Sequence, residues 1–192
     1  MTSMKIKQAA LSLFAESGYN GIALSEIAKA VGIRTPSIYA HFSSKEQLFL
    51  QLVDETAQEE IAALAHHMDN IQSSSAENKL YAMYRFFTDL DPISSQRAFL
   101  KRIIFTPPKP LKERLQRTFQ LYEEQLSSLI IQILKEGERK REFASLKTKP
   151  LVALFLGLSD GLMVEAQLYS PETYEDRQHI LWAWFKQLLL RG

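Results

Sequence analysis

Residues 23–42, ALSEIAKAVGIRTPSIYAHF, constrain the fold of this chain more than any other segment. Apolar residues at helical spacing line one face of its first half: Leu24, Ile27, Ala28 and Val31. Gly32 follows at the position where a left-handed residue ends a helix. Thr35 and Pro36 then offer a capping hydroxyl and a proline suited to the first helical position. The segment therefore predicts two short helices joined by a tight turn.

The second of these helices has one apolar and one polar side. Ile38 and Phe42 lie four residues apart and point inward. The turn and the outer side carry hydrogen-bonding side chains: Arg34, Thr35, Ser37, Tyr39 and His41. A helix of barely two turns is marginal in water and must pack on a neighbour. Such a pair fits a helix-turn-helix, whose second helix enters the DNA major groove, or an ordinary helical hairpin in a bundle.

The flanking sequence favours the DNA-binding alternative. Upstream, residues 6–19 place apolar side chains along one stripe of a helix, which Gly18 would end. Downstream, Ser43 and Glu46 have the spacing of a capping box, which predicts that a further helix begins there. Lys45 in its first turn opposes the helix dipole, so an external phosphate explains this lysine better than helix stability does.

Residues 6–49 resemble the N-terminal domain of the tetracycline-repressor (TetR/AcrR) family of bacterial transcription regulators. The matching segments are, in order, AALSLFAESGY, EIAKAVGI and SIYAHFSSKEQLF. The resemblance implies a three-helix DNA-binding domain over residues 1–46 and a helical effector-binding and dimerisation domain over residues 47–192. The chain departs from the family at Ala23, where members usually carry threonine or serine that caps the helix and often touches a phosphate. Ser25 is a candidate substitute.

Composition excludes several classes of protein. The 192 residues are 46% hydrophobic and 23% charged with a net charge of +1, as in globular domains. No apolar run reaches the roughly 18 residues of a membrane span, residues 1–10 lack the long apolar region expected of a signal peptide, and the sequence has no cysteine. We expect a bacterial cytoplasmic protein without membrane contact. We find no phosphate-binding glycine loop, zinc-ligand cluster or nucleophile motif, and therefore expect no metal, no cofactor and no enzyme activity.

Strand signals are nearly absent from the rest of the chain, which predicts an all-α fold of about nine helices. The last two helices carry apolar stripes too broad for a helix with one neighbour. We expect them to form a homodimer interface in a four-helix bundle, while an internal core pair is the alternative. The expected interface residues are Leu154, Gly157, Leu158, Gly161, Leu181, Trp184, Phe185 and Leu188.

The middle of the chain is rich in aromatic residues, most of which suit a plain core. The family resemblance implies a pocket for a small hydrophobic effector in this region. The candidate effector-binding residues are Phe86, Phe87, Phe105, Tyr122 and Asp160. Asp160 and Glu165 interrupt an apolar helix, so each carboxylate needs a partner. A cationic effector, an intersubunit hydrogen bond and a solvated rim are the alternatives.

These observations predict a homodimeric transcription regulator, a repressor that a small-molecule effector releases from a palindromic operator in double-stranded DNA. We expect base-edge contacts from Arg34, Thr35 and Ser37, with Pro36 in apolar contact, and phosphate contacts from Tyr39, His41 and Lys45. Effector binding would tilt the long helix that follows residue 44 and change the separation of the two recognition helices. The alternative is an all-helical small-molecule carrier that binds no DNA.

Overall fold

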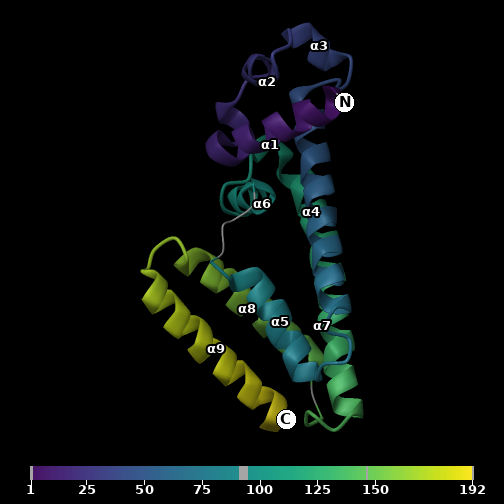
Figure 1. Cartoon of the computed structure of the whole chain (residues 1–192), viewed down its shortest axis with the longest axis vertical. Helices are drawn as coiled ribbons and strands as arrows, with labels where there is room; N and C mark the ends of the chain where they lie inside the picture. Colours follow the sequence, from purple (N-terminus) through teal and green to yellow (C-terminus); the bar gives the residue numbers. More distant parts are fainter. Residues whose placement is uncertain (1, 91–94, 146, 192) are drawn as a thin grey trace. The chain divides into compact units, whose positions relative to one another are not determined.

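The computed structural model describes residues 2–90, 95–145 and 147–191, and over these residues it contains nine α-helices, one 3₁₀ turn and no β-strand. Figure 1 follows the helices along the chain. They are α1 (Thr2–Gly21), α2 (Leu24–Val31), α3 (Thr35–Tyr39), α4 (Lys45–Asp69), α5 (Ala76–Thr88), α6 (Ser95–Phe105), η1 (Lys109–Leu111), α7 (Lys112–Arg139), α8 (Thr148–Glu165) and α9 (Pro171–Arg191). The all-α prediction is confirmed.

Contacts divide the chain into two compact units. Unit 1 contains residues up to 61 and residues 92–123, and unit 2 contains residues 62–91 and 124–192. The long helices α4 and α7 each contribute to both units. Within the described residues, no helix combines the length and the apolar character needed to span a membrane.

Unit 1 is built around α1, which packs against α6 and α2, while α2 packs against α3. The predicted inward residues Ile38 and Phe42 are buried, as are residues 48–50 in the first part of α4. Four aromatic rings, from α1, α4 and α6, meet at the centre of the unit: Phe14, Tyr19, Phe49 and Phe99. This aromatic cluster supports the short α2–α3 pair, which could not be stable by itself.

Two glycines shape the ends of the short helices. Gly18 has a φ of 73°, so α1 is interrupted there and the chain turns before Tyr19. Gly32 has a φ of 75° and ends α2 as predicted, with the N–H of Ile33 donating to the carbonyl oxygen of Ala28 at 2.9 Å. Both backbone conformations lie in the left-handed region, which a residue with a Cβ adopts only at a cost.

Replacing Gly32 with alanine is expected to lower the free energy of unfolding by roughly 1–2 kcal/mol. A Cβ at this position would meet no atom within 4 Å, so backbone strain is the whole effect. Gly32→Asn should recover part of the loss, because asparagine tolerates the left-handed conformation. Chemical denaturation of the three proteins measures the difference, and an alanine variant as stable as the wild type would contradict the assigned turn.

The capping prediction for α4 was wrong by one residue. Ser44 rather than Ser43 caps this helix, since its Oγ accepts the N–H of Gln47 at 3.0 Å. Neighbouring serines offer the same hydroxyl, so the capping pattern alone could not choose between them. A serine also caps α5, where the Oγ of Ser75 accepts the N–H of Asn78 at 3.2 Å.

The start of α3 also differs in detail from the prediction. Thr35 is its first helical residue, and no side chain caps this helix. The Thr35 hydroxyl is therefore not needed by the helix itself.

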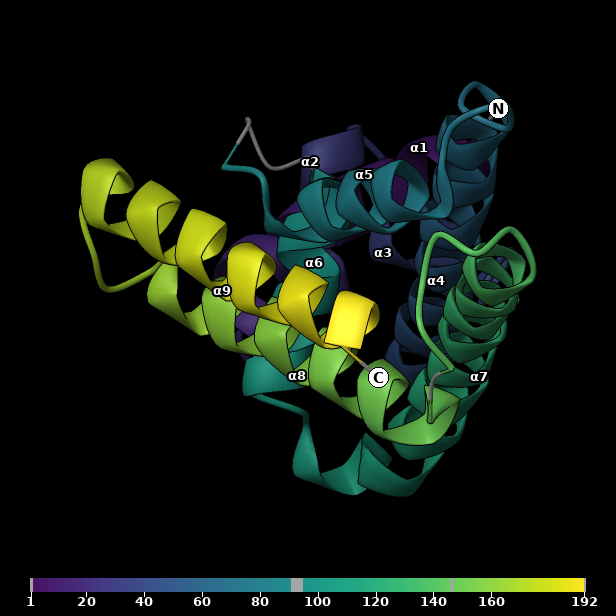
Figure 2. The same cartoon turned by 90° about the horizontal axis from the view of Figure 1, so that it is seen from below.

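In unit 2, α8 packs against α5 and α9, and Figure 2 shows α8 and α9 side by side. A buried polar network joins α5 to α9: the Gln178 amide donates to the Thr88 hydroxyl at 2.7 Å, and the Tyr84 hydroxyl donates to the backbone carbonyl of Gln178 at 2.9 Å. Tyr174 donates to the backbone carbonyl of Thr88, and burial raises its pKa to about 12, which keeps the phenol a donor. Lys79 ties α5 to Glu136 of α7 at 2.9 Å.

Candidate nucleic-acid interface

The predicted DNA-reading surface is formed by α3 and the turns on either side of it. Ile38 and Phe42 are buried and anchor this segment to unit 1. The remaining side chains reach solvent: Arg34, Pro36, Ser37, Tyr39 and His41 are exposed, and Thr35 is half-buried. Tyr39 is the large side chain that stands out from this surface, with 56% of it exposed. Hydrogen-bonding groups held on so short a packed helix suit contact with base edges and phosphates.

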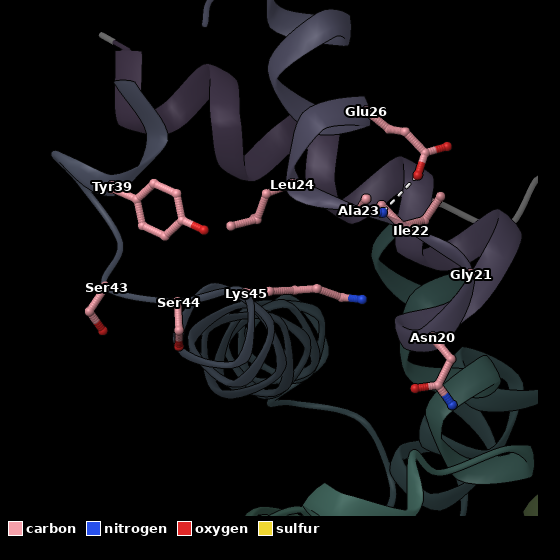
Figure 3. A pocket seen from close by; sticks show the side chains of 10 residues that line it. All are labelled: Asn20, Gly21, Ile22, Ala23, Leu24, Glu26, Tyr39, Ser43, Ser44 and Lys45. Carbon is pink, nitrogen blue, oxygen red and sulfur yellow. Dashed lines mark hydrogen bonds between the residues drawn. The ribbon is translucent and has the colours of Figure 1, made fainter. Parts of the chain in front are cut away.

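A pocket of about 590 Å³ adjoins this surface, and the end of α1, the start of α2, the end of α3 and the start of α4 line it. Its lining is shown in Figure 3 and consists of Asn20, Gly21, Ile22, Ala23, Leu24, Glu26, Tyr39, Ser43, Ser44 and Lys45. Tyr39 and Lys45 point into the pocket from different elements. Of the seven residues predicted to contact DNA, these two are brought together here.

The start of α2 supplies backbone donors to this pocket. The first N–H groups of a helix have no acceptor within the helix, and they carry the positive end of its dipole. The N–H of Ala23 is occupied, because it donates to a carboxylate oxygen of Glu26 at 2.7 Å. Ser25, the candidate substitute for the missing threonine or serine, is exposed in the first turn.

Lys45 is held in place by Tyr19. Its Nζ lies 4.4 Å from the centroid of the Tyr19 ring, a distance suited to a cation–π contact. Burial lowers the pKa of Lys45, and the smaller opposing effect comes from the Glu26 carboxylate, which raises it. Figure 3 shows the lysine extending across the pocket toward residues 21–23. The ammonium is thus partly buried and directed into the pocket.

Tyr19 and Glu26 were not among the predicted site residues. Tyr19 reaches Lys45 because Gly18 turns the chain before it and because its ring packs edge-on against Phe49, with centroids 4.8 Å apart. No local sequence pattern predicts such a contact between residues far apart in the sequence. Glu26 could have been found, since Ala23 and Glu26 have the spacing of a capping box from which only the hydroxyl is missing.

The predicted dimer face lies on α8 and α9 of unit 2. Leu154, Gly157, Gly161, Trp184 and Leu188 are exposed, and Leu158 and Leu181 are half-buried. A Cβ at either glycine would meet no atom within 4 Å. These residues leave a largely apolar surface uncovered on the single chain.

Phe185 does not belong to this face. Its side chain is 1% exposed and packs edge-on against Phe155, with ring centroids 5.6 Å apart, and against Trp182. The prediction placed Phe185 at the interface because it shares the spacing of the α9 stripe, whereas its ring packs against α8 and belongs to the core of unit 2.

The predicted effector residues fall into both units. Phe105 is exposed in unit 1, where the Tyr122 hydroxyl also donates to Glu60 at 2.7 Å. In unit 2, Phe86 and Phe87 pack edge-on, with ring centroids 5.2 Å apart, and Asp160 is exposed. The set therefore does not form one site within either unit.

Glu165, the second carboxylate of the apolar helix, has a partner within its own unit. Its Oε1 lies 2.8 Å from Nη1 of Arg177. The second oxygen, Oε2, is buried without a hydrogen bond among the described residues. A cationic effector is therefore not required to neutralise this group.

Comparison with known proteins identifies this arrangement. Residues 6–52 match the family described as bacterial regulatory proteins, tetR family. The chain is 33% identical over 88 residues to the biofilm operon negative transcriptional regulator IcaR of Staphylococcus epidermidis, which covers 45% of this chain and 46% of IcaR. It is 28% identical over 166 residues to the probable transcriptional regulator YttP of Bacillus subtilis, covering 85% and 76% of the two chains.

The fold is shared over nearly the whole chain. The structure of the transcriptional regulator FadR from Bacillus subtilis in complex with stearoyl-CoA superposes with a TM-score of 0.69 at 22% identity, and 98% of each chain is covered. The chain thus spans about half of IcaR, three quarters of YttP and almost all of FadR. These similarities support a DNA-binding regulator over the small-molecule carrier. The N-terminal part of the chain, residues 6–52, is thus a domain of the tetR family of bacterial regulatory proteins.

Proposed function

We propose that this chain is a homodimeric repressor that binds a palindromic operator and is released by a small hydrophobic effector. The observation that carries the proposal is the pocket in which Lys45, Tyr39 and the start of α2 converge beside the exposed side of α3. An ammonium, a phenol and free backbone N–H groups are the donors that phosphate contacts use in protein–DNA complexes. A chain with these donors beside a short packed helix is suited to the DNA major groove.

The position of each side chain suggests which part of the DNA it would contact. Arg34, Thr35 and Ser37 would meet base edges, and Pro36 would make apolar contact with a thymine methyl group. Tyr39 and Lys45 would hold one phosphate at the pocket, and His41 a neighbouring phosphate. The N–H groups of the first turn of α2 and the Ser25 hydroxyl would take the place of the side-chain contact that Ala23 cannot make.

Operator recognition requires two copies of the chain. A single two-turn helix reads only a few bases, whereas two copies related by a twofold axis read half-sites about 34 Å apart, or a multiple of it. The apolar surface of α8 and α9 is suited to this dimer contact, because Trp184 is 63% exposed and the glycines at positions 157 and 161 leave room for a partner. Such a regulator would work in the bacterial cytoplasm, where the chromosome lies.

The proposed direction of regulation and the effector class rest on the relatives. IcaR is named a negative transcriptional regulator, and FadR was crystallised with stearoyl-CoA. We therefore propose repression, and a long-chain acyl compound is a sensible first probe of the effector site. An effector releases DNA only by the difference in its affinity for the free and the DNA-bound conformations.

Replacing Tyr39 with alanine is expected to weaken operator binding at least about tenfold, because a hydrogen bond to a charged phosphate is lost in each half-site. The melting temperature should stay unchanged, since the side chain is largely exposed. Tyr169→Ala in unit 2, which also removes an exposed tyrosine, should leave DNA binding at the wild-type level. Fluorescence anisotropy with labelled operator DNA measures the three affinities, and equal losses in both variants would contradict the proposed contact.

A further inference from the structure

An acidic side chain lines the pocket beside α3. Of the ten lining residues, Glu26 is the one acid and Lys45 the one base. The Glu26 carboxylate accepts the N–H of Ala23 at 2.7 Å, and Figure 3 shows this bond at the start of α2, on the side of the pocket toward which Lys45 extends. The start of α2 near Lys45, which would attract a phosphate, is therefore already occupied by the Glu26 carboxylate.

The two charges act on each other. The Glu26 carboxylate stabilises the charged form of Lys45, whose ammonium is otherwise disfavoured by burial. A phosphate entering the pocket would draw on the same ammonium and on the same positive end of α2. It would also lie close to a like charge, which is unfavourable by Coulomb's law.

We propose that Glu26 competes with the DNA phosphate for Lys45 and for the start of α2, and so holds operator affinity below the value the pocket could reach. The inference rests on the proposed function and adds a tuning residue to it. Glu26 serves helix stability, because it caps Ala23 and lies favourably in the first turn of α2. The same carboxylate opposes DNA binding. Glu26 thus stabilises the fold and weakens the affinity for DNA.

A weakened complex is suited to release. A repressor that binds its operator very tightly is released only by an effector whose affinities for the free and the DNA-bound repressor differ greatly. A charge that lowers the affinity brings release within reach of an ordinary small molecule. Glu26 therefore helps the effector to release the operator by lowering the affinity for DNA, and it need not touch the effector.

The test is Glu26→Gln in the full chain, titrated with operator DNA. Glutamine at this position keeps the capping hydrogen bond to Ala23 while removing the charge. We expect about threefold tighter binding per half-site, the size of an exposed charge interaction, and hence about tenfold for the dimer on a palindrome. The melting temperature should fall slightly, because the favourable interaction with the α2 dipole is lost.

Glu59→Gln is the matched control. It removes the same charge from an exposed position of unit 1 on α4. Fourteen residues separate it from Lys45, or ~21 Å along the helix, more than twice the screening length of roughly 8 Å at physiological salt. This variant should bind DNA as the wild type does. Tighter binding with lower stability, seen in Glu26→Gln alone, is a combination that a purely structural role of Glu26 does not produce.

Two failures are distinguishable. If the wild type selects no operator, the proposed function and this inference both fall. If the wild type binds its operator and Glu26→Gln binds no more tightly than Glu59→Gln, the inference alone is overturned.

Discussion

Replacing Trp184 with glutamate is expected to convert the dimer into a monomer and to weaken operator binding at least about 100-fold, because an interface tryptophan at the centre of an apolar face is a typical hot spot. The side chain is 63% exposed on the single chain, one helical turn before the exposed Leu188. A glutamate there would be buried without a partner when two copies associate. Each monomer would then hold only one half-site and lose the gain that comes from tethering two.

Sedimentation velocity and operator titration measure the two effects on the same sample. Leu121→Glu on α7 is the control, since Leu121 is similarly exposed, at 61%, but belongs to unit 1, whereas α8 and α9 belong to unit 2. It introduces the same charge and should leave a dimer with wild-type affinity. A Trp184→Glu protein that remains dimeric would show that another surface joins the subunits.

The largest expected effect on stability is that of Phe49→Ala, which should lower the free energy of unfolding by roughly 3–5 kcal/mol. Phe49 is 1% exposed, and its ring centroid lies 5.1 Å from that of Phe14 and 5.4 Å from that of Phe99. Its removal leaves a cavity at the centre of unit 1. It also removes the ring that supports Tyr19 beneath Lys45. The variant should therefore bind DNA more weakly even at temperatures at which it is still folded.

Phe105→Ala is the matched control for stability. Phe105 is also in unit 1, but it is 45% exposed, so its truncation should cost less than about 1 kcal/mol. Chemical denaturation of the two variants and the wild type gives the comparison. Equal losses in both would contradict the aromatic cluster as the centre of unit 1.

Local signals were sufficient to predict the helix-turn-helix. Gly32 and Pro36 punctuate the segment by backbone conformation alone, and Ile38 and Phe42 follow helical spacing to the buried side. Each of these features is decided by neighbours within a few residues. The two short helices and the turn between them are therefore predictable from the segment itself, whereas the preference for a DNA-binding motif over a helical hairpin also needed the flanking sequence.

Features that depend on tertiary contacts were missed. The contact of Tyr19 with Lys45 joins residues 26 positions apart, and it exists only because Gly18 turns the chain and Phe49 holds the ring. Phe185 shares its spacing with exposed members of the α9 stripe, and only the packing of α8 shows that it is core. The placement of α6 against α1 is equally invisible in sequence order. The domain boundary after residue 46 and the effector residues remain predictions.

Selection of genomic DNA fragments by the purified full chain tests most directly whether this protein reads DNA as a dimer. The fragments would be captured at low and physiological salt, with and without a library of small hydrophobic compounds that includes stearoyl-CoA. We predict enrichment of a palindrome with half-sites about one helical turn apart or a multiple of it, and loss of that enrichment with at least one compound. Failure to enrich any palindrome, even at low salt, would contradict the proposed function.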